Sequence, residues 1–247
     1  MSASVADSTQ EGVRAFIDLH CHTSASFDSL ATVGAVVRAA ASRGLTHLAV
    51  TDHDRIDAAL GAQAVAPPGL TIIVGEEVKT ADGDLIAIFI RELVPPGLSA
   101  AETIAAIREQ GGLVGIPHPF DGLRGFGRKS GTGIESIAGL VDWVETYNAR
   151  VIGGSANERA ATFAQEYGLP GLAASDSHTV VEVGVSYNGV LGDPSTPAGL
   201  LAAIEAVDMH PARATFYVRA WPPLAKIIQS MRGNGRRRAP GTRGDSR

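Results

Sequence analysis

The sequence predicts a single α/β domain, because short apolar segments alternate with helical patterns along most of the 247 residues. A hydrophobic content of 45% is sufficient to bury a large core. The repeated order of strand and then helix favours a parallel sheet, either open or closed into a barrel. Because no internal repeat or linker divides the chain, we expect one domain over residues 14–231.

The predicted strands are short apolar runs, most of which end at polar residues. They cover residues 15–17, 45–50, 70–74, 85–90, 113–116, 141–147, 172–174 and 214–218. The predicted helices are bounded by capping residues and by glycine or proline. They cover residues 33–43, an alanine-rich segment that Pro67 stops, 100–110, 155–167, 197–206 and 223–231. Residues 121–133 contain five glycines and three basic residues, so we expect a mobile loop there.

The charge is distributed unevenly. Residues 232–247 hold six arginines and one acid, Asp245, so the remainder has 15 of the 21 basic and 25 of the 26 acidic residues, a net charge of −10. We expect residues 1–13 and the basic tail, residues 232–247, to be disordered. The acidic body argues against general nucleic-acid binding. For the tail, a solvated end is favoured over weak contact with nucleic acid or another anionic partner.

Cysteine content and the first residues bear on the compartment. Cys21 is the single cysteine, which excludes an internal disulfide and is compatible with a reducing compartment. The first twelve residues lack the basic and apolar regions of a signal peptide, and no later apolar run reaches the length of a membrane span. We therefore expect a cytoplasmic protein without a membrane partner.

Polar residues with metal-binding side chains follow the predicted strands. His20 and His22 lie at alternating positions after an apolar lead-in, so both rings can face one point. An isolated pair of this kind is usually structural, but further candidates follow later strands: His53, Glu77, His118, Asn148, Asp176 and His178. Five of the seven histidines lie at such positions, and the carboxyl ends of parallel strands are where sites form.

Five short motifs carry a family resemblance. They are Asp18-x-His20-x-His22, Thr51-Asp52-His53-Asp54, Gly75-x-Glu77, Pro117-His118-Pro119 and Ser175-Asp176-x-His178. Each is weak alone, but the ordered set, between about residues 17 and 191, resembles the polymerase and histidinol phosphatase (PHP) family. The resemblance implies a distorted (β/α)7 barrel, two or three metal ions at its C-terminal face, and metal-dependent phosphoester hydrolysis.

The resemblance also implies a ligand set. The first metal would take His20, His22, Glu77 and Asp176; the second, Glu77, His118 and Asn148; the third, Asp28, His53 and His178. Asn148 falls where some members have a histidine, and an amide oxygen binds metal more weakly. Imidazole nitrogen and carboxylate oxygen suit Zn, Mn or Fe better than Ca. Asp18 and Asp52 are expected to orient neighbouring imidazoles.

Phosphoester hydrolysis explains why these residue types are needed. Two metal ions lower the pKa of a bridging water toward roughly 7 and bind the phosphoryl oxygens, so a metal-bridging hydroxide is the expected nucleophile. Arg150, and less firmly Arg124 and Arg128, are candidates for binding the substrate phosphate, because a guanidinium matches its oxygens bidentately. The residues expected to carry catalysis are His20, His22, Glu77, His118, Asp176 and His178.

The function that the sequence predicts is hydrolysis of a small-molecule phosphomonoester, with a nucleotide among the candidates. Two alternatives stay open. One is a non-catalytic PHP module that binds metal, and the other is an amide or lactone hydrolase on the same barrel.

Overall fold

The computed structural model describes residues 13–122, 124–126, 133–152, 154–215, 218 and 221–236. The strands are β1 (Arg14–Asp18), β2 (His47–Val50), β3 (Thr71–Lys79), β4 (Asp84–Ile88), β5 (Leu113–Ile116), β6 (Trp143–Asn148), β7 (Gly171–Ala174), β8 (Tyr187–Leu191) and β9 (Val207–His210). The α-helices are α1 (Val33–Ser42), α2 (Asp57–Val65), α3 (Ala100–Glu109), α4 (Gly154–Tyr167), α5 (Pro197–Ala203) and α6 (Trp221–Met231), and a 3-10 helix covers Ile134–Leu140.

Local signals place most of these elements correctly. The capping box before α3 is confirmed: the Ser99 hydroxyl accepts from the backbone nitrogen of Glu102, whose carboxylate accepts from the backbone nitrogen of Ser99. The prediction of a strand over 214–218 is wrong, because residues 214 and 215 have no regular structure. Residues 216 and 217, the first twelve residues, residues 237–247 of the predicted basic tail and most of the predicted loop at 121–133 lie outside the described residues.

The strands form one sheet in the order β7-β6-β5-β4-β3-β2-β1-β8-β9. The expectation of a parallel sheet is correct for β1–β3 and for β5–β7, but β4 and β8 run antiparallel to both of their neighbours. The cause at β4 is the short turn that joins it to β3. Within that turn, the Thr80 hydroxyl bonds the carbonyl oxygen of Gly83 at 2.7 Å. A parallel pair would need a crossover of about a dozen residues or more.

The sheet curves round so that β7, the strand at one edge, lies beside β8, which is next to the other edge. Asn188 of β8 is fully buried, and its side chain takes the place of a backbone ladder. Its Oδ1 accepts from the backbone nitrogen of Ala173 in β7 at 2.8 Å, and its Nδ2 donates to the Ala173 carbonyl oxygen at 2.7 Å. Just beyond β1 and β7, the backbone nitrogen of His22 donates to the carbonyl oxygen of Ser177 at 2.9 Å. The sheet is therefore a nearly closed barrel, and the predicted α/β barrel class is confirmed.

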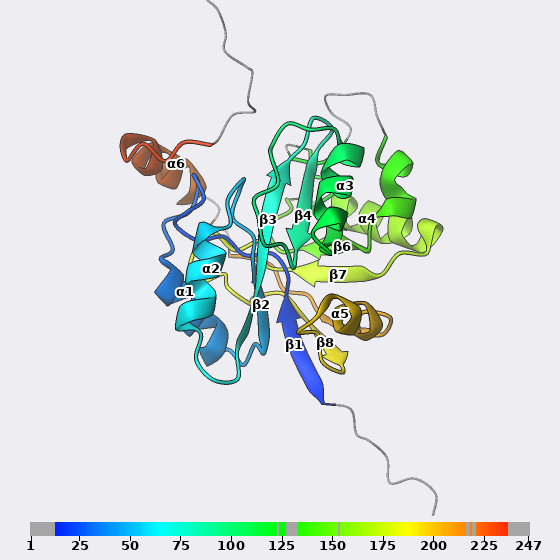
Figure 1. Ribbon diagram of the computed structural model, residues 1–247, viewed down its shortest axis with the longest axis horizontal. Coiled ribbons are helices and arrows are strands. Elements are labelled where there is room, and N and C mark those ends of the chain that lie inside the picture. Colours follow the sequence, from blue (N-terminus) through cyan, green and yellow to red (C-terminus); the bar gives the residue numbers. More distant parts are fainter. Residues whose placement is uncertain are drawn as a thin grey trace, which may run out of the picture.

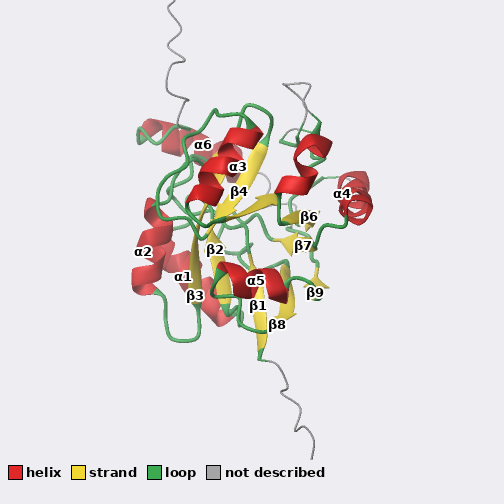
Figure 2. Ribbon diagram, turned by 45° about the vertical axis from the view of Figure 1, so that its right-hand side comes forward, coloured by secondary structure: helices red, strands yellow, loops and turns green. Residues whose placement is uncertain are grey.

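Helices cover the outside of the barrel and close one end of it. In Figure 1, α1 and α2 lie beside β2 and β3, whereas α3 and α4 lie beside β4 to β7. Figure 2 shows α5 across one end of the strands, where Leu200 and Ile204 join an apolar cluster inside the barrel with Ile17 and Trp143. A second cluster fills the layer between sheet and helices. Apolar packing thus closes the α5 end, and polar side chains gather at the other end.

The inner cluster yields a stability prediction at Gly115 of β5. A Cβ added there would overlap the ring of Trp143, which is 1% exposed and held in the packed interior. We expect Gly115→Ala to lower the free energy of unfolding by about 1–3 kcal/mol, because overpacking forces the ring or the backbone to shift. Urea denaturation measures this, and Gly139→Ala is the control, since its Cβ would meet open space. Equal stability of the two variants would contradict the prediction.

Candidate metal centre

The predicted ligands converge at the end of the barrel opposite α5. His20 and His22 follow β1, Asp28 lies in the loop after it, His53 follows β2, Glu77 lies within β3, His118 follows β5, Asn148 ends β6, and Asp176 and His178 follow β7. Glu77 was expected after the end of a strand. It lies inside β3 instead, because pairing with β4 extends that strand to Lys79.

Two of these residues have an uncommon backbone conformation. The φ angle is 29° at His118 and 49° at Asp176. Non-glycine residues seldom adopt positive φ, and such positions gather at functional sites.

The Glu77 carboxylate lies at the centre of four imidazoles. Its Oε2 is 3.3 Å from Nε2 of His20, 3.2 Å from Nε2 of His22 and 3.0 Å from Nδ1 of His53. Its Oε1 is 3.2 Å from Nε2 of His118. All five side chains are buried. One carboxylate can therefore bridge four donor atoms that come from the ends of three different strands, β1, β2 and β5.

Asp176 forms a second centre next to Glu77. Its Oδ1 lies 3.6 Å from Nε2 of His20 and 3.5 Å from Nε2 of His22. Its Oδ2 accepts from Nη1 of Arg124 at 2.6 Å and from Nδ2 of Asn148 at 3.2 Å. Asp176 thus links the histidines after β1 to an arginine and an amide.

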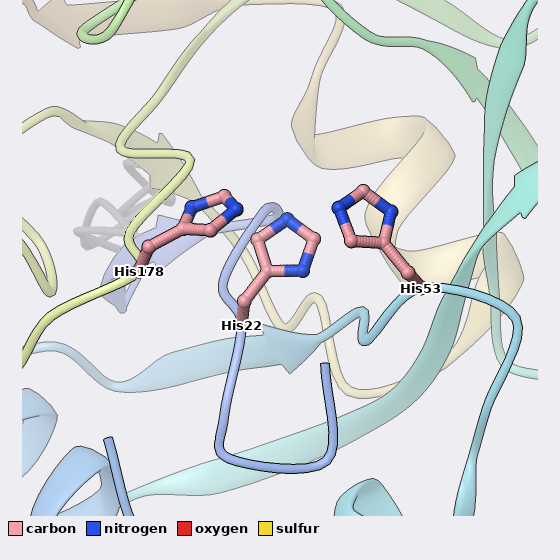
Figure 3. A group of neighbouring side chains, drawn as sticks. All are labelled: His22, His53 and His178. Atoms are coloured by element: carbon pink, nitrogen blue, oxygen red, sulfur yellow. The ribbon is translucent and has the colours of Figure 1, made fainter. Parts of the chain in front are cut away.

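Asp28 gathers the third set of donors. Its Oδ2 is 3.5 Å from Nε2 of His53, and its Oδ1 is 3.3 Å from Nε2 of His178. The rings of His22, His53 and His178 face one another although they come from separate segments (Figure 3), with ring centroids 4.2 Å apart for His22 and His178 and 4.5 Å for His22 and His53. The irregular loop after His22 therefore delivers a carboxylate to two histidines on other strands.

Burial and opposite charge compete in setting the pKa values of the cluster. Burial opposes ionisation of both Glu77 and Asp176. The histidines around Glu77 nevertheless hold its carboxyl pKa well below its usual range. At Asp176, Arg124 and His20 lower the carboxyl pKa in the same way. The pKa of Asp28 is also well below its usual range, because His178 and His53 outweigh the effect of burial. The carboxylates are therefore in the ionised form that binds cations.

The histidines divide into two groups. Burial lowers the pKa of His20 and His22, but nearby carboxylates outweigh it, raising the pKa of His20 well above its usual value and that of His22 to about 9. At His178 burial prevails over the attraction of Asp28, and its pKa falls to about 4. His178 is therefore neutral near pH 7, whereas His20 and His22 must release a proton when they coordinate a metal.

The donor set fits divalent metal ions. Within this cluster, four of the buried polar atoms that the structure describes make no hydrogen bond: Oδ1 of Asp28, Nδ1 of His53, Nδ1 of His118 and Oδ1 of Asp176. Three groups have ligand atoms that lie within 4.8 Å of one another: His20 with His22 and Glu77, His20 with His118 and Asp176, and His22 with His53 and His178. Nitrogen and carboxylate donors of this kind suit first-row transition metals, and buried polar atoms are otherwise rarely left unpaired.

Glu145 of β6 is a member of the site that sequence reasoning missed. Its Oε1 lies 2.6 Å from Nδ1 of His20, and its Oε2 accepts from the backbone nitrogen of His118 at 3.0 Å and from Nδ2 of Asn148 at 2.8 Å. A carboxylate on the far nitrogen fixes the ring and strengthens a histidine as a ligand. The sequence carried no clear signal for it, because the same strand also contains the polar residues Thr146 and Asn148.

Glu145→Gln is expected to weaken metal binding about tenfold or more, because outer partners of metal ligands have effects of this size. If the amide nitrogen of the glutamine takes the place of Oε2, its hydrogens point at two other donors, the backbone nitrogen of His118 and Nδ2 of Asn148. Both hydrogen bonds would then be lost. Competition with a chromophoric chelator measures the zinc affinity. Glu109→Gln, on the surface of α3, is the matched control, and an unchanged affinity in Glu145→Gln would rule out this role.

The expectation that Asp18 and Asp52 orient neighbouring imidazoles differs in outcome between the two residues. The Asp18 carboxylate accepts from the backbone nitrogens of His20, Ser175 and Gly184, so it fixes chain segments and no ring. Asp52 acts on His22 indirectly, since it accepts from the Ser26 hydroxyl at 2.6 Å, and that hydroxyl lies 3.0 Å from Nδ1 of His22.

Asn148 remains a predicted ligand. Its Nδ2 donates to Glu145 and Asp176, and its Oδ1 accepts from the backbone nitrogen of Arg150.

Positive side chains line a cavity of about 310 Å³ beside Asp28 and His178. Arg124 and Arg150 were predicted there, and Lys226 of α6 joins them. Nη1 of Arg150 is 2.6 Å from Oε1 of the buried Glu182, which fixes its direction. Arg128 lies outside the described residues. Lys226 carried no signal in the sequence, because it belongs to an amphipathic helix far along the chain from the motifs.

Comparison with known proteins agrees with this geometry. Residues 18–112 match the PHP domain family, and residues 143–208 match the PHP-associated family. An uncharacterised protein of Methanocaldococcus jannaschii is 31% identical over 173 residues, which cover 69% of this chain and 68% of that protein.

Two solved structures share the fold at low sequence identity. A two-domain protein from Bacteroides vulgatus, containing a predicted PHP-like metal-dependent phosphoesterase, has a TM-score of 0.67 at 16% identity, over 82% of this chain and 66% of that one. A lesion-specific endonuclease from Pyrococcus furiosus has a TM-score of 0.63 at 17% identity, over 80% of this chain and 58% of that one. This chain thus spans about two thirds of the first structure and less of the second. With both family matches and a relative of this identity and coverage, the chain belongs to the PHP domain family.

Proposed function

We propose that this protein hydrolyses a small-molecule phosphomonoester, a nucleotide being one candidate, with two or three bound divalent ions of Zn, Mn or Fe. The observation that carries the proposal is the cavity that Asp28, Asp121 and His178 line together with the cations Arg124, Arg150 and Lys226. Three cations beside a set of metal ligands suit a substrate with concentrated negative charge, whereas a neutral amide or lactone would not need them.

In this proposal, some residues of the site bind the metal ions and others orient those ligands. When bound, the metal ions supply the Lewis acidity that neutralises phosphoryl charge and makes water a stronger nucleophile. The proposed ligands are His20, His22, Asp28, His53, Glu77, His118, Asn148, Asp176 and His178. Glu145 holds the ring of His20, so that its other nitrogen faces Glu77 and Asp176.

Two arginines connect the ligands to the substrate cavity. The Arg124 guanidinium bonds Asp176 and, at 3.0 Å, Asp121, which leaves it between the metal ligands and the cavity. Arg150 is oriented by Glu182, whose Oε2 also accepts from the backbone nitrogen of His178 at 3.1 Å. A guanidinium held in this way can bind phosphate oxygens without a large loss of side-chain freedom.

The cavity volume favours a small substrate over a nucleic-acid chain. About 310 Å³ lies at the lower end of the range for small-molecule sites.

Among the described residues, no helix combines the length and apolar character that a membrane span requires.

The test is an assay of purified, manganese-loaded protein against a panel of phosphomonoesters, nucleotides, a DNA duplex, simple amides and lactones. Phosphate release from a phosphomonoester supports the proposal. Cleavage of amides or lactones alone, or of DNA alone, would overturn it in favour of those substrates. Metal binding without turnover of any compound would instead indicate the non-catalytic module.

A further inference from the structure

The loop of residues 23–29, which carries Asp28, has little regular structure of its own. Three backbone hydrogen bonds shape it: the nitrogen of Ser24 donates to the carbonyl oxygen of Ala31 at 2.7 Å, that of Ser26 to Thr23 at 3.0 Å, and that of Ser29 to Ser26 at 3.4 Å. Because no strand ladder holds this loop, the position of the Asp28 carboxylate depends on side chains that contact the loop from outside.

On the barrel side, Asp52 holds the first half of the loop. Its carboxylate accepts from the backbone nitrogens of Thr23 at 2.7 Å and Ser26 at 3.1 Å, as well as from both hydroxyls. These bonds end at Ser26. They fix the segment next to His22 and leave the segment that leads to Asp28 to other contacts.

On the opposite side, α6 holds the loop through Gln229. This side chain is 2% exposed, and its Nε2 lies 2.8 Å from the carbonyl oxygen of Ser24, 3.2 Å from that of Ser26 and 2.7 Å from that of Ser29. The three carbonyls share two amide hydrogens. Gln229 therefore ties the two ends of the loop together around Asp28.

The residues after α6 add contacts to the same loop. Nδ2 of Asn234 lies 3.1 Å from the carbonyl oxygen of Ala25. Arg236 places its guanidinium 5.4 Å from the ring centroid of Phe27 and donates from Nε to Oδ2 of Asp54, next to the ligand His53. These contacts lie at the end of the barrel toward which β1 points, where α6 stands apart from the other helices (Figure 1).

We propose that the C-terminal clamp, defined as residues 226–236, positions the Asp28 loop for metal binding, with Gln229 as its central positioning residue. The clamp sets the affinity of the donor group formed by Asp28, His53 and His178, and it leaves the group of His20, His22 and Glu77 unaffected. The inference rests on the metal assignment in the proposed function. It also gives a role to residues 232–236, which the sequence placed in the basic tail.

The test measures zinc binding by the full chain in competition with a chromophoric chelator, together with the zinc content after dialysis. Gln229→Met keeps the length of the side chain and removes the donor. We expect one zinc-binding step to weaken about tenfold or more while the tightest step is unchanged. Ser230→Ala, on the exposed face of the same helix, is the matched control and should bind zinc like the wild type.

A merely structural role of Gln229 would change stability alone. A lower melting temperature of Gln229→Met with all zinc affinities unchanged, measured where the protein is folded, would overturn the proposal. Should Gln229→Met fail to fold, Asn234→Ala decides: it is expected to weaken the same step by a smaller factor, and unchanged affinities would refute the clamp.

Zinc titration needs no substrate, which separates this proposal from the proposed function. A wild-type chain that binds zinc but hydrolyses no phosphoester would remove the proposed substrate class and leave the clamp open to its own test. An active enzyme whose Gln229→Met variant binds zinc normally would remove the clamp alone.

Discussion

His20→Ala is expected to abolish phosphoester hydrolysis, lowering kcat by about a thousandfold or more. His20 contacts both central carboxylates, Glu77 and Asp176, and Glu145 holds its other nitrogen. Its loss removes one donor from two of the three ligand groups. Lewis-acid stabilisation of a phosphoryl transition state is worth several kcal/mol, and about 1.4 kcal/mol corresponds to a factor of ten in rate.

Steady-state phosphate release by the manganese-loaded variant measures this effect, with circular dichroism to show that the barrel is folded. His210→Ala is the control, because His210 lies in β9, stacked on Tyr187 and outside the metal ligands. Full activity in His20→Ala, or in wild-type protein stripped of metal, would exclude metal-dependent hydrolysis at this site.

Asn188→Ala is expected to lower the free energy of unfolding by about 3 kcal/mol. The substitution leaves the backbone nitrogen and carbonyl oxygen of Ala173 without the two bonds that Asn188 supplies at the meeting of β7 and β8. Each buried polar group left unpaired costs about 1–3 kcal/mol, and the deleted side chain leaves a cavity in addition.

Urea denaturation followed by circular dichroism measures the Asn188→Ala effect. Gln165→Ala, on the exposed face of α4, is a control that removes a polar side chain from the surface. A change of less than about 0.5 kcal/mol in Asn188→Ala, the usual range for surface substitutions, would show that the Asn188 bonds are not what joins β7 to β8.

The parts of the fold and site that the sequence predicts are those with a local signature. His20 and His22 could be assigned to one face because their spacing matches the strand period, and the Ser99 capping box marks the start of α3. The direction of β4 has no comparable signature in its own residues. It is determined by the short connection to β3, which apolar patterning alone does not register.

The missed contributors share a physical reason. Glu145, Lys226 and Gln229 reach the site through tertiary contacts, and nothing in their neighbouring residues distinguishes them from structural or surface positions. Asn188 is similar, because a polar residue in an apolar strand gives no indication of which distant backbone it will pair with. Resemblance to family motifs indicated the ligand candidates but gave no indication of Glu145 or Gln229, which lie outside the motifs.

The order in which the chain emerges during synthesis has a consequence for metal acquisition. Two of the three donor groups include a residue at position 176 or 178, and the loop that carries Asp28 is tied to Gln229. A nascent chain that exposes only the first hundred residues has His20, His22 and Glu77 and neither of the other groups. The complete cluster of donors can therefore form only after the residues that follow β7 have emerged, so a shorter nascent chain offers fewer metal ligands.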